Sequence, residues 1–544
     1  MKTTTISRSA AAASMERRRH ERDEDRCRYV TQRFDRERTG WNPREARLNV
    51  DNVSERFGPL LTLDVSGEVF AQPLYVDGVE AHHRRHDILF VATAENWVYA
   101  FDTETFAPIW PPRRLTPSGC LPYLSDMAYH GLGYNDFSPG RTVGIIGTPV
   151  IDPERHVAYL VTTFQTVPYA PGQAAPPGAV QHWLHAIDLR SGKDVAGTSP
   201  QQISASVGAT TFDSRVQMQR PGLLLLNDRL YIGFGSYGDN TNIAPYYGWV
   251  LIYEARLLEQ LAIFLTSSQG GGSIWHSGTG VAADAKASVY FATGNGPFGP
   301  VSPPGSQARS DYGDSVLRLE PHWSGGTPTD YFTPFNQAQL NSGDLDQASG
   351  GVLVVPGDFQ GTEVLVQVGK AGTIYVLDRK GLGGFQGPLG PDQVVQSTPL
   401  PGSSGEKFYG CPAYYKTSAG NRMVYLAGMS LPIIGYQFDH TAHLSSVSQT
   451  GDVFPGYGTI PVVSSHRSHA GTGVLWSIQN TMDGVNSLRL KAYDAENLAT
   501  RLVDLPCGTW PKQGSFLVPT VAEGKVYVGS DGQVQVFGLT GDDE

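Results

Sequence analysis

The chain repeats one short unit of two strand-like apolar runs, and this repetition limits the folds open to it more than any other feature. In each unit a run rich in β-branched and aromatic residues is followed by a second run of the same kind. Glycine or aspartate bounds the runs, which is the pattern of strands joined by tight turns. The paired runs are 88–93 with 97–102, 157–161 with 183–188, 230–235 with 249–254, 289–293 with 315–319, 364–368 with 373–378, 423–427 with 434–439, 474–478 with 488–494, and 525–529 with 533–538.

A stretch of small residues precedes many of these units, as in Gly147–Asp152, Ser277–Ala283, Gly350–Val355 and Val518–Ala522. Small residues suit a strand that is crowded at a narrow axis. Four-stranded units repeated about every 60 residues are typical of a propeller. The sequence therefore predicts an all-β protein, an eight-bladed β-propeller of four-stranded blades.

The two ends of the chain complete this prediction. The last unit lacks a fourth strand, whereas Leu60–Val65 is a spare strand near the beginning. We expect this N-terminal strand to close the ring, because closure protects sheet edges. Residues 1–50 hold 13 Lys and Arg against 8 Asp and Glu, with few apolar residues near the start. We therefore predict a basic, disordered tail over 1–38 and a single propeller domain over 39–544.

An acidic residue ends the second run of most units. We expect each of these side chains to accept hydrogen bonds from the amides of the following turn, a structural role. They are Asp102, Asp188, Glu254, Asp378, Asp439 and Asp494.

Composition excludes several classes of protein. The net charge of −11 argues against a nucleic-acid-binding surface. Apolar runs such as Leu223–Leu226 are far too short to cross a membrane. The four cysteines form no CxxC pair, which excludes a zinc ribbon and an attached c-type haem. No apolar leader follows the first basic residues, so we expect a cytoplasmic protein unless the start codon is misassigned.

The sequence resembles a known family at several places. The stretch Tyr99–Trp110 resembles the blade repeat of quinoprotein dehydrogenases, in which Ala, Asp, Thr and Trp hold neighbouring blades together. Further stretches are similar to a bacterial, pyrroloquinoline-quinone-like group of eight-bladed proteins, most of them without an assigned activity. These stretches are Val69–Val76, Gly147–Asp152, Arg220–Leu226, Gly248–Leu251, Ala292–Gly296 and Gly524–Gly529. The resemblance covers about residues 39 to 540 and specifies fold, not function.

The resemblance implies a cofactor that the residues only partly support. A quinone dehydrogenase of this kind holds calcium or a lanthanide with carboxylate and amide oxygens, and uses an aspartate base. Many also carry a vicinal disulfide, but this chain has no Cys-Cys pair. Acidic residues near the expected inner strands are few, namely Asp284, Asp344 and Asp346. We expect no cofactor and no metal, with pyrroloquinoline quinone (PQQ) and calcium as the alternative.

Propellers bind ligands where the inner strands converge, at the mouth of the central channel. Four residues there are candidates for proton transfer: His276, His466, His469 and Lys370. A histidine titrates near neutral pH and suits acid/base catalysis. The alternatives are that His276 bonds to a neighbouring loop, that His466 and His469 form a metal pair or a plain polar loop, and that Lys370 is a solvent-exposed turn residue.

Aromatic and polar residues near the same mouth are candidates for substrate binding. Tyr237, Tyr246 and Tyr247 lie in an insertion where related chains often have histidines, so an aromatic pocket would replace a metal site. The long insertion 113–141 could cover the mouth, because loops of this length are often functional. The full set of candidates is Trp275, Tyr237, Tyr246, Tyr247, Tyr129, His130, Tyr409 and Asp344.

Three functions fit these expectations. The first is a cofactor-independent acid/base enzyme, a cyclase, lyase or isomerase, acting on a small organic substrate, with secondary metabolism as the expected setting. The second is a PQQ- or metal-dependent dehydrogenase. The third is a non-catalytic scaffold that binds a protein. The first is preferred, with no nucleic acid or membrane partner and with the oligomeric state open.

Overall fold

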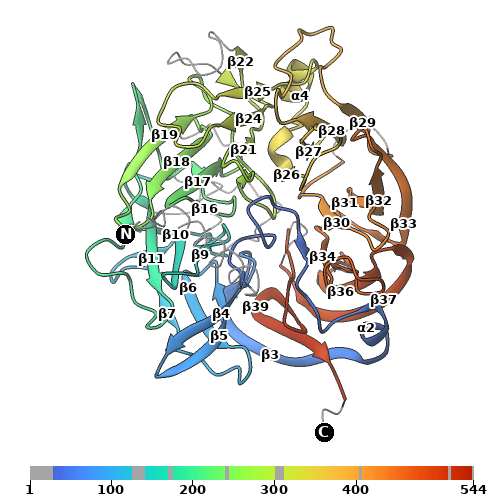
Figure 1. Ribbon diagram of the computed structural model, residues 1–544. Coiled ribbons are helices and arrows are strands. Elements are labelled where there is room, and N and C mark those ends of the chain that lie inside the picture. Colours follow the sequence, from blue (N-terminus) through green and yellow to red (C-terminus); the bar gives the residue numbers. More distant parts are fainter. Residues whose placement is uncertain are drawn as a thin grey trace, which may run out of the picture.

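The computed structural model describes residues 28–124, 141–168, 175–238, 244–299, 311–402, 407–511 and 516–541. Small antiparallel sheets stand around a common centre, and each sheet follows the previous one along the chain (Figure 1). This is a β-propeller, and the predicted all-β class of four-stranded sheets is confirmed.

The first three sheets are each built on one consecutive stretch of chain. The first contains β4 (Leu74–Ala81), β5 (Arg84–Ala92), β6 (Trp97–Asp102) and β7 (Arg113–Arg114). The second contains β8 (Leu121–Pro122), β9 (Val150–Asp152), β10 (Val157–Gln165), β11 (Val180–Asp188) and β12 (Gln201–Gln202). The third contains β15 (Gln217–Met218), β16 (Leu224–Leu226), β17 (Arg229–Ser236), β18 (Trp249–Glu254) and β19 (Gln260–Leu265).

The next four sheets follow the same order. The fourth contains β20 (Ala282–Ala283), β21 (Val289–Ala292), β24 (Val316–Leu319) and β25 (Asp330–Phe332). The fifth contains β26 (Val352–Val354), β27 (Val364–Val368), β28 (Thr373–Asp378) and β29 (Gln396–Pro399). The sixth contains β30 (Ala413–Lys416), β31 (Arg422–Ala427), β32 (Leu431–Phe438) and β33 (Leu444–Phe454). The seventh contains β34 (Val462–Ser464), β35 (Val474–Asn480), β36 (Ser487–Asp494) and β37 (Asn497–Thr509).

The last sheet joins the two ends of the chain. It contains β38 (Thr520–Ala522), the long β39 (Lys525–Leu539) and β3 (Phe57–Glu68). β3 runs antiparallel to β39, with Phe57 opposite Leu539 and Leu63 opposite Val534. The strand predicted at Leu60–Val65 is therefore the one that pairs with the end of the chain.

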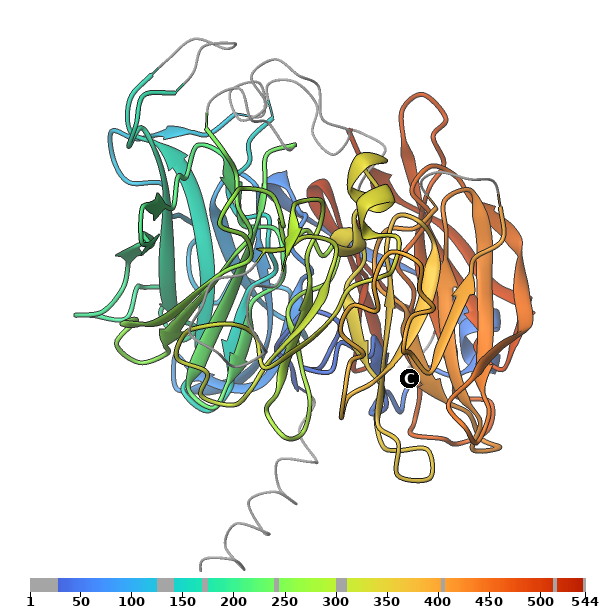
Figure 2. The ribbon, with the colours of Figure 1, turned by 90° about the horizontal axis from the view of Figure 1, so that it is seen from above.

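A few short elements lie outside these sheets. The helices are α2 (Val50–Arg56), α4 (Gln337–Ser342) and the 3-10 turn η1 (Gln347–Ser349). The short strands are β1 (Arg28–Tyr29), β2 (Trp41–Asn42), β13 (Ser206–Val207), β14 (Thr210–Thr211), β22 (Phe298–Gly299) and β23 (Asp311–Tyr312). Side-on, α4 stands at one rim of the ring (Figure 2). Within the described ranges no helix has the length and hydropathy that crossing a bilayer requires.

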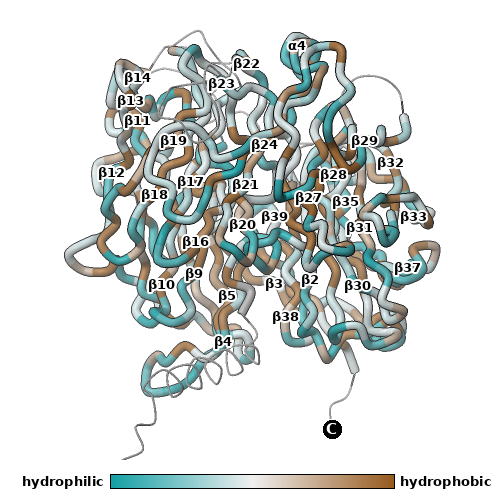
Figure 3. Tube along the Cα trace, turned by 45° about the horizontal axis from the view of Figure 1, so that its top comes forward, coloured by the Kyte–Doolittle hydropathy of each residue, from teal (hydrophilic) through white to brown (hydrophobic). Residues whose placement is uncertain are grey.

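The core lies between neighbouring sheets. Leu353 and Val366 of the fifth sheet pack with Val424 of the sixth, and Leu230 of the third packs with Tyr159 of the second. Brown, apolar stretches follow the strands in Figure 3, among them β27 and β28. Side-by-side burial of two sheet faces holds a propeller together, because each sheet alone would leave both faces in water.

The acidic turn residues do what the sequence predicts. Asp102 accepts hydrogen bonds from the amides of Glu104 and Thr105, at 3.0 and 2.7 Å. Amides two residues on donate in the same way to Asp188, Glu254, Asp378, Asp439 and Asp494. The repeated carboxylate is thus a structural turn residue.

Residues 28–43, which we call the axial segment, lie in the middle of the ring (dark blue in Figure 1). Arg33 and Arg38 within it have no exposed surface. The predicted tail boundary at residue 38 is therefore wrong for the described part of the tail, because residues 30–38 pack inside the protein. The reason is that the strands around them supply hydrogen-bond acceptors that a charge-rich sequence does not reveal.

The axial segment contacts the innermost strand of sheet after sheet. β1 pairs with β4 of the first sheet. The amides of Ile151, Ala283, Val354, Tyr414 and Val463, in the second and fourth to seventh sheets, donate to carbonyls of the segment at 2.7–2.9 Å. Asn42 donates to Val521 O of the last sheet at 2.9 Å.

The two arginines add bonds of their own. Arg38 donates from Nε to Val281 O at 2.9 Å and from Nη2 to Leu223 O at 3.1 Å. Arg33 donates to Pro412 O at 2.6 Å and to Pro461 O at 3.3 Å. Each guanidinium therefore joins the entries of two inner strands.

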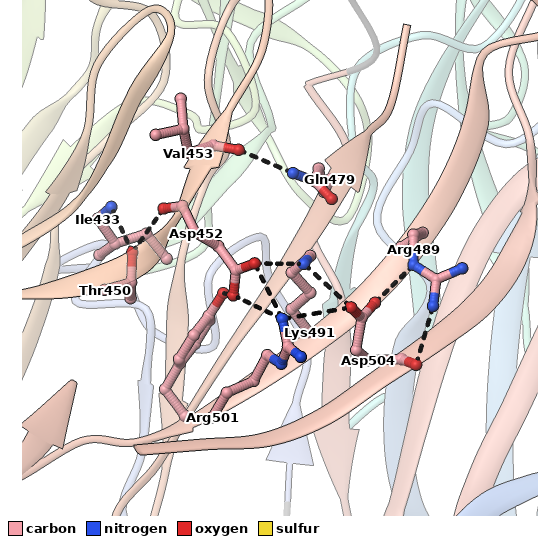
Figure 4. Close-up of polar contacts among 10 residues, drawn as sticks. Ile433, Thr450, Asp452, Val453, Gln479, Arg489, Lys491, Arg501 and Asp504 are labelled. Carbon is pink, nitrogen blue, oxygen red and sulfur yellow. Dashed lines mark hydrogen bonds and ion pairs between the residues drawn. The ribbon is translucent and has the colours of Figure 1, made fainter. Parts of the chain in front are cut away.

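A charged network fastens the sixth sheet to the seventh at their outer strands (Figure 4). The ammonium of Lys491, with only 4% of its side chain exposed, lies 2.9 Å from Asp452 Oδ1 and 3.2 Å from Asp504 Oδ2. Although partial burial opposes it, hydrogen bonds from Tyr493 and Lys491 lower the pKa of Asp452 below its ordinary value.

We predict that Asp452→Asn destabilises the protein by about 2 kcal/mol at pH 7, because it leaves the Lys491 ammonium short of a partner. A carboxyl with a lowered folded pKa stabilises above the unfolded value of about 4 and loses this contribution as pH falls through the folded pKa. The difference between the variant and the natural protein should therefore shrink below about pH 4. Urea unfolding across pH measures it, with Asp64→Asn on the exposed side of β3 as the control. An undiminished difference at low pH would contradict the prediction.

A buried histidine lies between the second and third sheets. His182 has no exposed surface, and its ring meets Phe212 and Phe234 edge-on at 5.8 and 5.6 Å. Neither ring nitrogen has a hydrogen-bond partner among the described protein atoms. Burial lowers the pKa of His182 to about 3.

We predict that this histidine makes the fold weaker in mild acid. A lowered folded pKa means that the unfolded chain takes up a proton first, so stability falls as pH drops below about 6.5. The free energy of unfolding of His182→Phe minus that of the natural protein should be about 2 kcal/mol larger at pH 5 than at pH 8. Thermal or urea unfolding at the two pH values measures this, and exposed His440→Gln is the control. Equal differences at both pH values would refute it.

Candidate functional site

The candidate site is built from loops on one face of the ring, which we call the mouth face. The chain enters the inner strands β20, β26 and β30 from this face, and Trp275, His276, Asp344, Asp346 and Tyr409 precede these strands. These residues therefore lie in the connections that lead into the inner strands.

His276 is held inside the protein. It has no exposed surface, its Nε2 accepts the amide of Ala292 at 3.0 Å, and its Nδ1 lies 3.2 Å from Gly280 O. Burial, followed by the nearby Arg38 charge, lowers the pKa of His276 to about 4. Both nitrogens are used by the backbone, so the geometry supports the alternative of a loop-bonded histidine and argues against catalysis.

His466 and His469 lie at the other end of an inner strand. They follow β34, in the connection to β35, whereas His276 precedes β20. Their Nδ1 atoms are 3.1 Å apart, and His469 is exposed. The expectation that an inner strand begins near 465–471 is wrong, because β34 has already ended at Ser464. These histidines are therefore away from the mouth face and cannot act together with Lys370 or Asp344.

The structure places two of the predicted site residues, Lys370 and Asp344, next to each other. Lys370 lies in the turn between β27 and β28, where its amide donates to Asp346 O at 2.9 Å. Its Nζ lies 3.2 Å from Asp344 Oδ1 and 2.7 Å from Asp346 Oδ2. The side chain of Asp344 is 65% exposed, while those of Lys370 and Asp346 are 12% and 3% exposed. An accessible carboxylate is thus attached to a largely buried ion pair.

Two further residues complete this cluster, and the sequence interpretation missed both. Asn295 donates through Nδ2 to Asp344 Oδ1 at 2.6 Å and through its amide to Asp346 Oδ1 at 2.8 Å. Asp314 has no exposed surface, and burial together with the charge of Asp346 raises its pKa well above the ordinary value. The short pattern Gly-Asn-Gly around Asn295 gave no sign of this role.

A depression of about 430 Å³ adjoins the cluster. Its lining is uncharged and rich in amides and backbone, and it includes the predicted residue Tyr246. The lining residues are Pro245, Tyr246, Gln269, Gly270, Gly271, Asn295, Gly296, Pro297 and Asn341. The size falls within the range of small-molecule sites, and Asn295 joins the depression to Asp344.

The other predicted binding residues do not line this depression, although Tyr247 bridges to Gly271 at its edge. Tyr237 is buried against Tyr123, with ring centroids 5.4 Å apart, and Tyr247 is half-buried against Trp249. Trp275 is 7% exposed and is a core residue. Tyr409 packs edge-on against Tyr457 at 4.7 Å. Tyr129 and His130 lie outside the described residues.

The axis itself is closely packed above the axial segment. A side-chain carbon at Gly278 would lie 2.0 Å from Ile460 Cδ1 and 2.7 Å from Phe516 O. A carbon at Gly410 would lie 2.7 Å from Ile460 Cγ1. These described loops are therefore in close contact with one another, and none of Gly278, Gly410 and Ile460 lines the depression.

Solved structures with a similar fold carry names related to the resemblance in the sequence. A quinohemoprotein alcohol dehydrogenase from Comamonas testosteroni matches with a TM-score of 0.59 at 15% identity, over 95% of this chain and 81% of that one. A quinohemoprotein alcohol dehydrogenase from Pseudomonas putida HK5 matches with a TM-score of 0.57 at 13% identity, over 95% of this chain and 81% of that one. A europium-containing methanol dehydrogenase matches with a TM-score of 0.57 at 14% identity, over 94% of this chain and 98% of that one.

The chain thus has the propeller fold of quinoprotein dehydrogenases, as the resemblance predicts. No protein-family model matches the chain, and no curated protein does. At identities this low the structural likeness concerns the fold, and activity has to be argued from the site.

The residues at hand do not fit calcium and a quinone. The Lys370 ammonium already takes up oxygens of Asp344 and Asp346, where a metal ion would need them. Asp284 accepts the amides of Lys286 and Ser288 and pairs with Arg379 at 3.1 Å. In the described ranges no three His, Cys, Asp or Glu side chains gather in a way that could hold a metal.

We predict that His276 contributes much more than His466 to the free energy of unfolding. His276→Ala leaves the buried amide of Ala292 without its acceptor and opens a cavity, so it should cost about 3 kcal/mol. His466→Ala, which is partly exposed, should stay within about 0.5 kcal/mol of the natural protein. Urea unfolding measures both. Similar values for the two would contradict the assignment of His276 to the fold.

Proposed function

We propose that the protein is a small-molecule-binding propeller that catalyses proton transfer without a cofactor, at the depression beside Lys370 and not on the axis. The observation that carries the proposal is the exposed carboxylate of Asp344, held 3.2 Å from the Lys370 ammonium next to an uncharged, amide-lined depression. Buried ion pairs are costly, and a site that keeps one beside a cavity is a functional candidate.

Asp344 is the group suited to exchange a proton with a bound molecule. Its carboxylate is exposed, and Lys370 and Asn295 fix its orientation through contacts at 3.2 and 2.6 Å. It would accept a proton from one position of the substrate and return it either to another position, which is an isomerisation, or to a departing group, which is an elimination. Neither reaction needs an oxidant. Asp346 stays with Lys370 and acts as a positioning residue.

The charges favour one kind of ligand. The carboxylates of Asp344 and Asp346 both face the ammonium of Lys370, and burial together with the charge of Asp346 raises the pKa of Asp314 well above its ordinary value. A neutral or cationic polar molecule therefore suits the site better than an anion. The amides of Gln269, Asn295 and Asn341 and the exposed backbone of the glycines would bind its hydroxyl or carbonyl groups.

The proposal includes the finer architecture. We propose a ring of eight blades in which β3 is the outer strand of the last blade. The antiparallel pairing of β3 with β39 supports this, as does the packing of Val521 and Val528 of the last sheet in one core cluster with Tyr75 and Leu89 of the first.

Binding and turnover can be tested separately. Ligand-detected NMR with a panel of neutral and cationic hydroxy, carbonyl and amine compounds below about 300 Da, a size suited to this depression, probes binding. Asn341→Trp, placed on the exposed lip at α4, should abolish the signals of bound compounds, while exposed Asn497→Trp on β37 should preserve them. If the signals of bound compounds persist in both variants, or disappear in both, the depression is not the binding site.

We predict that Asp344→Asn keeps binding and removes proton transfer. Hydrogen–deuterium exchange into a bound compound should fall at least about 100-fold, because a general base typically contributes 10²–10⁴-fold. The exposed side chain means that stability should change by less than about 1 kcal/mol. Unchanged exchange in the variant would remove the catalytic part of the proposal and leave binding.

A further inference from the structure

The axial segment is held as a ligand is held in a site. Its main chain accepts amides from inner strands of several sheets, and its two guanidinium groups reach carbonyls on four different strand entries. Arg38 also donates from Nη1 to Gln32 O at 2.7 Å and to Thr31 Oγ1 at 2.6 Å. Burial of a charge is tolerated only when its donors are met in this way.

The walls around the segment are shaped to fit it. A side-chain carbon at Gly222 would lie 2.2 Å from Gln32 Oε1, and one at Gly280 would lie 2.3 Å from Gly222 O and 2.9 Å from Arg38 Nη2. Gly222 and Gly280 form a bridge with each other beside the segment. Glycines at the entries of two inner strands therefore leave the space that two side chains of the segment fill.

The segment is joined to the rest of the protein at one described end. After Asn42 the chain passes the exposed residues Arg44, Ala46 and Arg47 before α2 begins at Val50. Buried Glu45 anchors this passage by accepting the amides of Arg47 and Gly524, at 2.8 and 3.0 Å. On this described side, residues 44–49 are the covalent link between the segment and the sheets, and residues 30–43 are held in the ring by non-covalent contacts.

We propose that the centre of the propeller is a binding site for an extended peptide with two arginines five residues apart, occupied in the intact chain by its own residues 28–43. The main-chain amides of the inner strands would bind the backbone of such a peptide, and the carbonyls at Leu223, Val281, Pro412 and Pro461 would select its arginines. The ring is then a receptor, and the N-terminal segment is its tethered ligand. This inference is independent of the proposed proton transfer.

The test uses the full chain, folded before it is cut. A specific protease site is inserted between Ala46 and Arg47, and the purified protein is cleaved. Native mass spectrometry should then show the N-terminal fragment still bound to a folded ring. A fluorescent synthetic peptide of residues 28–46 should replace the fragment, as measured by anisotropy and by release of the fragment.

Variants of the synthetic peptide test which side chains the site recognises, and they leave the folded protein itself unchanged. Peptides with Arg33→Gln or Arg38→Gln should compete at least about 100-fold more weakly, because each change leaves buried carbonyls without charged donors. The Arg36→Gln peptide is the matched control, since the Arg36 side chain is 41% exposed and pairs with adjacent Glu37. Equal competition by all three variants, failure of the natural peptide to exchange, or unfolding of the ring on cleavage would each overturn the proposal.

Discussion

The structure depends on two positive charges placed where solvent does not reach. Burying a guanidinium costs several kcal/mol unless its donors are satisfied. Arg33 and Arg38 find their acceptors in main-chain carbonyls at the entries of the inner strands, from Leu223 to Pro461. Those carbonyls point inward because strands that converge on an axis have no further strand to bond with. The arginines thus meet acceptors that the propeller geometry creates, and each one links two neighbouring sheets whose residues are far from it in sequence.

This filled centre explains where the candidate site lies. Loops at Gly278, Gly410 and Ile460 pack tightly above the axial segment, so a ligand has no evident place on the axis among the described residues. The nearest chemistry is displaced outward to Asp344, Lys370 and Asn295, between the fourth and fifth sheets. Structural neighbours of this fold are named as a quinohemoprotein alcohol dehydrogenase and a methanol dehydrogenase, and in this chain the carboxylates of Asp344 and Asp346 are already paired with a lysine.

Local pattern was enough to predict the strands, the acidic turns and the pairing of β3 with the end of the chain, because each depends on alternation and turn chemistry within a few residues. Lys370 and Asp344 could be chosen as candidates for the same reason, since both border inner or neighbouring strands. Arg33 and Arg38 were read as part of a solvated tail because their partners lie up to 428 residues away. His466 and His469 were misplaced by an error of a few residues in one strand boundary, which moved them from one end of β34 to the other.

The order in which the segment and its acceptors are made has a consequence for synthesis. Residues 28–43 leave the ribosome early, but Pro461 and Val521, which they contact, come more than 400 residues later. At 5–20 residues per second the segment waits for roughly 20 to 100 seconds. The part of the described chain that is translated first therefore cannot make its full set of contacts until the last sheets exist.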